Sequence, residues 1–136
     1  MKSKRITSLT IQQESWGLLA PDEDSSHELK INRRGTVSHN IYAGSKEKPA
    51  RVYKYKVGID KIEEFFNFLE NKIKIHSWTD DYSVDVCDGY HWTIIVRYSD
   101  NRIKKIEGTV EPPPEGKKLE RLIKKMILFE ERPWIF

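Results

Sequence analysis

The stretch from Tyr82 to Gly108 constrains the fold more than any other part of the chain, because apolar and polar residues alternate along most of it. A period of two places successive side chains on opposite faces of a β-strand. Asp88-Gly89 interrupts the alternation and marks a turn. A two-residue loop there would set apolar against polar residues, so we predict a three-residue loop, Cys87–Gly89. The predicted cross-strand pairs are Val86 with Tyr90, Val84 with Trp92 and Tyr82 with Ile94.

A second turn is expected at Ser99–Arg102, followed by a strand over Ile103–Val110. Two adjacent lysines, Lys104 and Lys105, break the alternation of this strand. Such a break indicates either a bulge or an edge strand that carries lysines. The three prolines at Pro112–Pro114 end the strand, because proline has no N–H to donate to a ladder.

The first half of the chain contains further segments with a strand-like alternation. They are Ile6–Gln13, Glu28–Asn32, Thr36–Tyr42 and Arg51–Val57. The second and third are joined by a turn at Arg33–Gly35 and form a hairpin. The stretch Pro21–Ser26 is rich in acidic and small residues and is interpreted as a loop.

Two segments have helical periodicity. The first is expected to begin at Asp60, which with Glu63 forms a capping box. Its apolar stripe consists of Ile62, Phe65, Phe66, Leu69 and Ile73. The second is expected to begin after Gly116 and to be ended by Pro133. Its apolar stripe is Leu119, Leu122, Ile123, Met126 and Ile127, and its other face carries lysines and an arginine.

These elements predict one α+β domain over residues 1–136, with an antiparallel sheet built of hairpins and two amphipathic helices packed on one face. A chain of this length buries roughly two-thirds of its unfolded surface and needs no covalent staples. A possible internal repeat is visible, since Leu29–Gly44 and Trp92–Gly108 both read as strand, turn, strand and glycine before a proline-containing segment and a helix.

Several functional classes are disfavoured by the sequence. A single Cys excludes an intramolecular disulfide and a zinc site with several Cys ligands. The first ten residues have no apolar core of a secretory signal, and no run is long enough to span a membrane, so we expect a cytoplasmic protein without a membrane partner. Phosphate-binding loops and the common hydrolase motifs are absent. We therefore expect no cofactor and assign no catalytic or metal-binding residue.

An enzyme remains the third hypothesis. In the predicted hairpin Asp85 lies opposite His91 with Cys87 at the turn, a set that can activate a thiolate. The same residues are also an ordinary solvent face of a hairpin. A metal site is the other enzyme hypothesis, but the spacing of its candidate ligands matches no known pattern. Those candidates are His76, Asp80, Asp81, Asp85, Asp88 and His91.

A domain that binds single-stranded nucleic acid is the second hypothesis. Basic residues of the predicted turns and of the second helix would contact phosphates, while Tyr53, Tyr55 and Trp92 would stack on bases. The opposing interpretation is that the lysines form a solvated helix face and that the aromatic residues belong to the core. The net charge of +3 is modest for such a function.

Our first hypothesis is a non-enzymatic module that binds another protein. The apolar tail Trp134–Phe136 and Phe68, which lies off the main helical stripe, are candidates for an exposed interface. The alternative is that the tail packs on its own core. The candidate binding residues are Arg33, Arg34, Arg102, Lys104, Lys105, Lys117, Lys118, Arg121, Trp134 and Phe136. The sequence does not specify the partner or the oligomeric state.

The run Trp92–Gly108, followed by three prolines, Gly116 and an amphipathic helix, resembles a pattern in small bacterial proteins of uncharacterised families. The resemblance covers Trp92–Ile127 and implies a fold-like arrangement of a Trp-led hairpin, a Pro-rich segment and a helix. It implies no activity and no functional residues. Some small α+β proteins of this size act as immunity proteins or inhibitors, an analogy that fits a protein partner.

Overall fold

The structure of the protein is a computed structural model, which describes residues 4–15, 23–44, 47–84 and 89–136. These residues form seven strands: β1 (Ile6–Ser15), β2 (Asp24–Asn32), β3 (Thr36–Ala43), β4 (Arg51–Lys56), β5 (Asp81–Tyr82), β6 (Tyr90–Tyr98) and β7 (Ile103–Thr109). Helix α1 (Ile59–Asn67) continues into a π-helical turn (Phe68–Lys72), and a 3-10 turn (Ile75–Ser77) follows. Helix α2 (Gly116–Met126) comes after β7.

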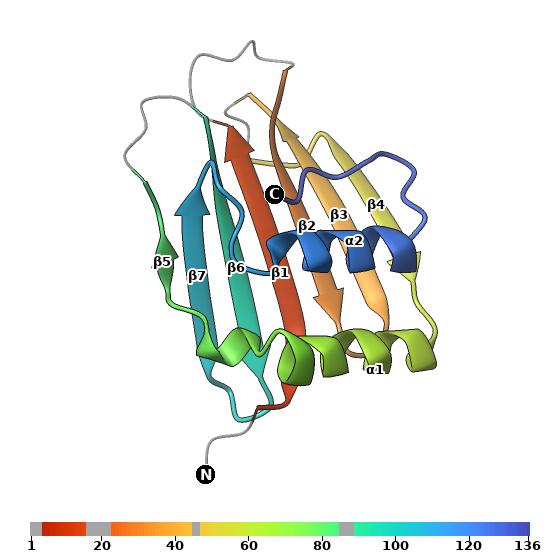
Figure 1. Cartoon of the computed structure of the whole chain (residues 1–136). Helices are drawn as coiled ribbons and strands as arrows, with labels where there is room; N and C mark the ends of the chain where they lie inside the picture. The colour runs from red at the N-terminus through yellow and green to blue at the C-terminus, as the bar shows by residue number, and fades with distance from the viewer. Residues whose placement is uncertain (1–3, 16–22, 45–46, 85–88) are drawn as a thin grey trace.

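The strands form one sheet with the order β4-β3-β2-β1-β6-β7-β5 (Figure 1). Neighbouring strands are antiparallel, except that β5 runs parallel to β7. Strands β1 to β4 are consecutive in the sheet, β6 and β7 form a hairpin, and the pairing of β1 with β6 joins the two groups. The predicted α+β class with an antiparallel sheet is confirmed, while the packing of both helices on one face, the single domain and the internal repeat stay predictions.

The strands of the first half agree with the predicted segments, with one correction. Strand β2 begins at Asp24, which pairs with Ala43 of β3, so Asp24–Ser26 is not the predicted loop. A register shift between Asp24 and Ser26 accommodates this start of the strand. Polar residues extend the strand here because backbone pairing with β3, rather than an apolar alternation, holds them in the sheet.

The predicted hairpin between Tyr82–Val86 and Tyr90–Tyr98 is wrong. Tyr82 pairs with Gly108 of β7 in a parallel register and not with Ile94. Strand β6 is bordered by β1 on one edge and by β7 on the other, so neither edge is available to Tyr82 or Val84. Alternation correctly predicted which side chains of β6 share a face, but it carries no information on which strand lies beside it. Residues 85–88 of the predicted hairpin lie outside the described residues.

The hairpin of β6 and β7 agrees with the sequence. The pairs run without interruption from His91 with Thr109 to Arg97 with Ile103, so Lys104 and Lys105 mark no bulge. The outer edge of β7 meets β5 only at Glu107 and Gly108. Among the described residues, no strand pairs with the rest of that edge. This agrees with the second alternative of the sequence analysis, an edge strand that carries lysines.

The register of the sheet gathers apolar side chains on one face. Leu9 of β1 lies opposite both Ile31 of β2 and Val96 of β6, and this phase continues into β3 and β7. Figure 1 shows α1 and α2 drawn in front of the sheet, at an angle to its strands. Apolar residues of the sheet and of both helices are buried in one cluster. The other face of the central strands is polar and includes Ser8, Thr10, Gln12, Glu28, Lys30, Asn32, Thr36, Ser38 and Arg97.

Both helices depart from their predicted ends. Gly58 is the N-cap of α1 and no side chain caps it, so the predicted capping box of Asp60 and Glu63 is wrong. Asp60 instead lies in the first turn, where a negative charge favours the helix. Helix α2 ends at Met126 and not at Pro133, because the backbone becomes extended at Ile127. No helix among the described residues is both long enough and apolar enough to cross a membrane.

Trp92 and Gly108 explain part of the pattern that the sequence analysis singled out. They lie opposite each other on β6 and β7, and a Cβ at Gly108 would stand 2.4 Å from the indole ring. Trp92 is fully buried, and its indole N–H donates to the carbonyl of Glu111 at 2.7 Å. Gly116 meets Pro113 in the same way, at 2.9 Å. The Trp, Gly and Pro residues of this pattern therefore form a packing unit.

Gly108→Ala is expected to destabilise the protein by about 3 kcal/mol, because the new methyl group overpacks a rigid part of the core. Gly58→Ala is the matched control, since no atom lies within 4 Å of its Cβ position, and it is expected to change the stability by less than about 1 kcal/mol. Urea unfolding at pH 7 measures both values. Equal effects of the two variants would contradict the packing of Trp92 on Gly108.

Candidate interaction site at helix α2 and the following segment

Arg33, a predicted binding residue, is engaged inside the protein. Its guanidinium donates to both oxygens of Glu63 at 3.0 and 2.9 Å and to Glu70 at 2.6 Å. It also donates to the carbonyl of Ile6 at 2.8 Å and lies over the ring of Phe66. The hydrogen bond to Glu63 is the main cause that raises the pKa of Arg33, and Arg33 in turn lowers the pKa of Glu63. Arg33 fastens the β2–β3 turn to α1.

The other cations of the predicted turns are not gathered into one site. Arg34 is exposed in the β2–β3 turn, and Arg102 pairs with its neighbour Asp100 at 2.8 Å. Lys104 pairs with Asp80 at 3.0 Å, and Lys105 pairs with Glu107 at 3.4 Å. Lys104 and Lys105 are consecutive residues of β7, so their side chains point to opposite faces of the sheet.

Helix α2 concentrates positive charge on its solvent face. Its eleven residues carry five cationic side chains and one carboxylate, a net charge of +4, whereas the whole chain has a net charge of +3. The helix holds Lys117, Lys118 and Arg121 of the predicted site, together with Lys124 and Lys125. Three of these lysines pair with Glu115 or Glu120. Arg121 and Lys125 are exposed and form no ion pair with a described residue.

The chain after α2 returns across the upper part of the sheet and covers strands β2 to β4 (Figure 1). We call Ile127–Phe136 the return segment. Its residue Ile135 is buried, and the ring of Phe136 meets Trp92 edge-on at 5.6 Å between centroids. Trp134 stacks on His27 at 4.5 Å but remains 40% exposed. The tail that the sequence offered as an interface thus packs mainly on its own core, and Trp134 alone of its three residues keeps a large exposed surface. Phe68 is also partly buried against the core.

Polar contacts from β4 hold the return segment in place. Arg51 donates to both oxygens of Glu131 at 2.8 Å, and it also binds the carboxylate of Asp24. Tyr53 donates to Glu131 at 3.0 Å, and the backbone N–H of Glu130 donates to the hydroxyl of Tyr55 at 2.9 Å. The hydrogen bond from Arg51 is the main cause that lowers the pKa of Glu131. Tyr53 and Tyr55, which the sequence assigned to base stacking, are used in these contacts.

Two buried histidines lie beneath the return segment, and the sequence analysis did not single them out. His27 of β2 is 3% exposed and His39 of β3 is fully buried. Their ring atoms Nδ1 of His27 and Nε2 of His39 lie 2.9 Å apart. The sequence contains a signal for both, because His27 is in phase with Leu29 and Ile31, and His39 stands between Val37 and Ile41 in the same alternation.

The histidine pair is held in its neutral form at pH 7. Burial, followed by the proximity of His39, lowers the pKa of His27 to about 4, and burial also lowers the pKa of His39. The second ring nitrogen of each histidine, Nε2 of His27 and Nδ1 of His39, has no hydrogen-bond partner among the described residues. A buried polar atom without a hydrogen-bond partner costs free energy. The pair therefore destabilises the folded state through these two nitrogens, although its rings also pack in the core.

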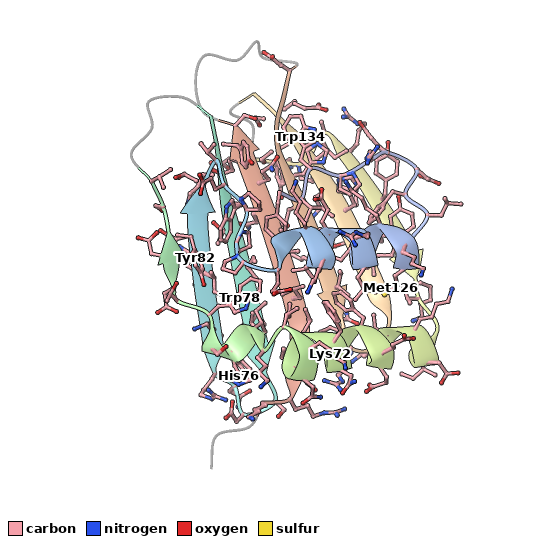
Figure 2. The ribbon with its side chains drawn as sticks, viewed as in Figure 1. Lys72, His76, Trp78, Tyr82, Met126 and Trp134 are labelled. Carbon is pink, nitrogen blue, oxygen red and sulfur yellow. The ribbon has the colours of Figure 1, made fainter. Side chains whose placement is uncertain are left out.

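A groove of about 470 Å³ lies between α2 and the return segment. Glu120 and Lys124 of α2 and Arg132 of the return segment supply its charged groups. Tyr90, Trp134 and Phe136 supply aromatic surface. Figure 2 shows Trp134 above α2, at the opposite end of the sheet from His76. The groove therefore combines two predicted binding residues, Trp134 and Phe136, with the basic helix.

Neither the thiol site nor the metal site of the two enzyme hypotheses is assembled by the described residues. Asp85, Cys87 and Asp88 lie outside them. His91 is at the start of β6, beside Glu14 of β1, whereas His76 lies in the 3-10 turn at the other end of the sheet. Within the described part of the chain, no three His, Cys, Asp or Glu residues are placed to hold a metal ion.

A comparison with models of protein families and with curated proteins finds no match to this chain. A function is therefore inferred from the arrangement of the residues of this chain.

Ile135→Ala is expected to destabilise the protein by about 2–5 kcal/mol, because it leaves a cavity where the return segment enters the core. Leu128→Ala removes a side chain that is 95% exposed in the same segment, and it is expected to change the stability by less than about 0.5 kcal/mol. Thermal and urea unfolding give both values. A small effect of Ile135→Ala would mean that the tail is exposed, as the first sequence hypothesis requires.

Proposed function

We propose that this protein is a non-enzymatic binding module that recognises an acidic segment of another protein through α2 and the adjoining groove. The observation that carries the proposal is the concentration of charge. The net charge of +4 on α2 exceeds that of the whole chain, so the remainder of the chain has a net charge of −1. The proposal takes both helices to pack on the same face of the sheet, which leaves the charged side of α2 turned to solvent.

The surface has the composition of a protein interface. Trp134 offers a large, partly exposed aromatic ring whose other face rests on His27, so little side-chain entropy is lost when a partner covers it. Arg121 and Lys125 are exposed on α2, each next in sequence to a residue that lines the groove, and Arg132 borders the groove. An apolar anchor surrounded by cations suits a peptide that presents one apolar residue among Asp and Glu residues.

A protein partner is favoured over nucleic acid by the location of the aromatic residues. Trp92 is fully buried, and Tyr53 and Tyr55 are half-buried with their hydroxyls bound to the return segment, an arrangement that differs from an open platform of aromatic rings for bases. An acidic protein partner agrees with the inhibitor or immunity role that the analogy drawn from the sequence implies.

Selection of random peptides displayed on phage tests the proposal. We expect the selected peptides to contain an excess of Asp and Glu around one apolar residue, and their affinity to fall as salt is added because exposed charges are screened. The double variant Arg121→Ala/Lys125→Ala is expected to weaken binding by about two- to ten-fold. Trp134→Ala is expected to weaken it by about ten-fold or more. Fluorescence anisotropy with a labelled selected peptide measures these changes.

Lys54→Ala/Lys56→Ala is the matched control, since it removes two exposed cations from the sheet face that points away from α2. It should leave the affinity unchanged. Selected peptides without an excess of acidic residues, or equal losses in the two double variants, would contradict the proposal. Tighter binding of a single-stranded oligonucleotide, weakened by the same α2 variant, would replace it with the nucleic-acid hypothesis.

A further inference from the structure

The buried histidine pair is placed where its protonation acts directly on the return segment. The backbone N–H of Trp134 points to Nδ1 of His27 at 3.4 Å, and Nε2 of His39 lies 2.9 Å from the same atom. The indole of Trp134 stacks on His27, and Phe129 meets His39 edge-on at 5.8 Å between centroids. Both histidines are thus covered by the return segment on the side that faces away from the sheet.

These contacts assign the tautomers of the pair. Because the N–H of Trp134 approaches Nδ1 of His27, this nitrogen is assigned as the acceptor, and His39 then donates through its Nε2–H. Nδ1 of His39 consequently carries a buried lone pair without a partner. A first proton can bind there without breaking the bond between the rings. A second proton, on Nδ1 of His27, would leave three N–H donors facing one another.

We propose that His27 and His39 form an acid-operated latch that holds the return segment on the sheet at neutral pH and releases Trp134–Phe136 when both rings are protonated. The part of this inference that concerns ligand binding rests on the proposed function, because release removes the groove beside α2. The part that concerns the return segment stands on the geometry of the pair.

The charged and titratable groups around the pair come from each neighbouring strand and from the return segment itself. They are Asp24 of β2, Arg51 and Tyr53 of β4, and Glu131 of the return segment. Gln13 of β1, opposite His27, is uncharged. Asp24 and Glu131 favour the protonated form of His27, whereas Arg51 and burial disfavour it. Since burial is the largest of these influences, the pair is neutral until the solution becomes distinctly acidic.

The direction of the pH dependence follows from the lowered pKa of His27. The unfolded chain binds a proton near pH 6.5, while the folded protein binds it near pH 4. Between these values the unfolded or released form holds more protons than the closed form, so the closed form loses stability as the pH falls. Above pH 6.5 both forms are neutral at this site, and the closed form keeps its full stability.

The two ends of the return segment are expected to respond differently. The hydrogen bond from Arg51 lowers the pKa of Glu131, which favours the charged form of this carboxylate and its contact with Arg51. Phe129–Glu131 therefore stays anchored to β4. Trp134, which rests on His27, leaves first, and Ile135 and Phe136 follow it out of the core.

Hydrogen–deuterium exchange read by mass spectrometry tests the latch, with rates corrected for the intrinsic effect of pH. From pH 7 to pH 4 we expect peptides that cover residues 132–136 to lose protection by about ten-fold or more, while peptides from β1 and β6 keep theirs. His27→Gln/His39→Gln removes both titrating groups and should abolish this local loss. His76→Gln changes a histidine at the other end of the sheet and should leave the loss as in the wild type.

Three results would overturn the latch. One is protection of residues 132–136 that does not depend on pH, and another is an equal loss in the double glutamine variant. The third is simultaneous loss in β1 and β6, which would show global acid unfolding. If the double variant does not fold, NMR titration of the wild type decides the question, because the ring signals of both histidines and the amide signal of Trp134 must change with the same midpoint.

Binding of a selected acidic peptide at pH 7 and pH 4.5 separates the latch from the proposed function. The acidic peptide titrates equally in both experiments, so the ratio of wild-type to double-variant affinity isolates the histidines. We expect this ratio to fall by about five-fold or more at pH 4.5. Local release without peptide binding at either pH would retain the latch and refute the proposed function. Peptide binding with an unchanged ratio would retain the function and refute its control by the latch.

Discussion

The antiparallel pairing of β1 with β6 is the interaction on which the rest of the structure depends. It joins strands β1 to β4, which are consecutive in the chain, to a hairpin that begins 75 residues after β1 ends, and it runs from Ile6 opposite Tyr98 to Ser15 opposite Tyr90. Its register sets Leu9 and Ile11 beside Val96 and Ile94. The apolar faces of the two groups therefore become one surface, and a shift by a single residue would turn one of them to solvent.

That common apolar surface is covered by two kinds of structure. Apolar residues of α1 and α2 belong to the same buried cluster as those of the sheet, and the return segment passes over β2 to β4 (Figure 1). An extended cover suits this part of the sheet, because His27 and Tyr55 accept backbone N–H groups there, and the N–H groups in the interior of a helix are used within the helix. The return segment supplies those groups from Glu130 and Trp134, and a carboxylate from Glu131.

The end of α2 at Met126 connects the packing of the return segment on the sheet with the groove at the surface. After the helix end, Trp134 stacks on His27 and Arg132, Trp134 and Phe136 line the groove opposite Glu120 and Lys124. Ending the helix early places the basic face of α2 beside an aromatic ring that is fixed from below by a histidine. Trp134 belongs both to the groove and to the contact with the buried histidine pair, which is why the proposed binding and the proposed latch are linked.

Local pattern determined much of this protein. The period of two along β1, β3 and β6, the helical stripes and the turn at Ser99–Arg102 could be predicted because adjacent residues establish them, and the basic face of α2 follows from spacing alone. Only the tertiary structure decided that Tyr82 pairs with β7, that Arg33 lies between two glutamates, and that Trp134 rests on His27. Each of these contacts joins residues that are more than 20 positions apart, and the free energy of such a contact depends on which surfaces the whole sheet leaves unpaired. Alternation states which face a side chain occupies, but the partner on that face is chosen by the packing of the complete chain.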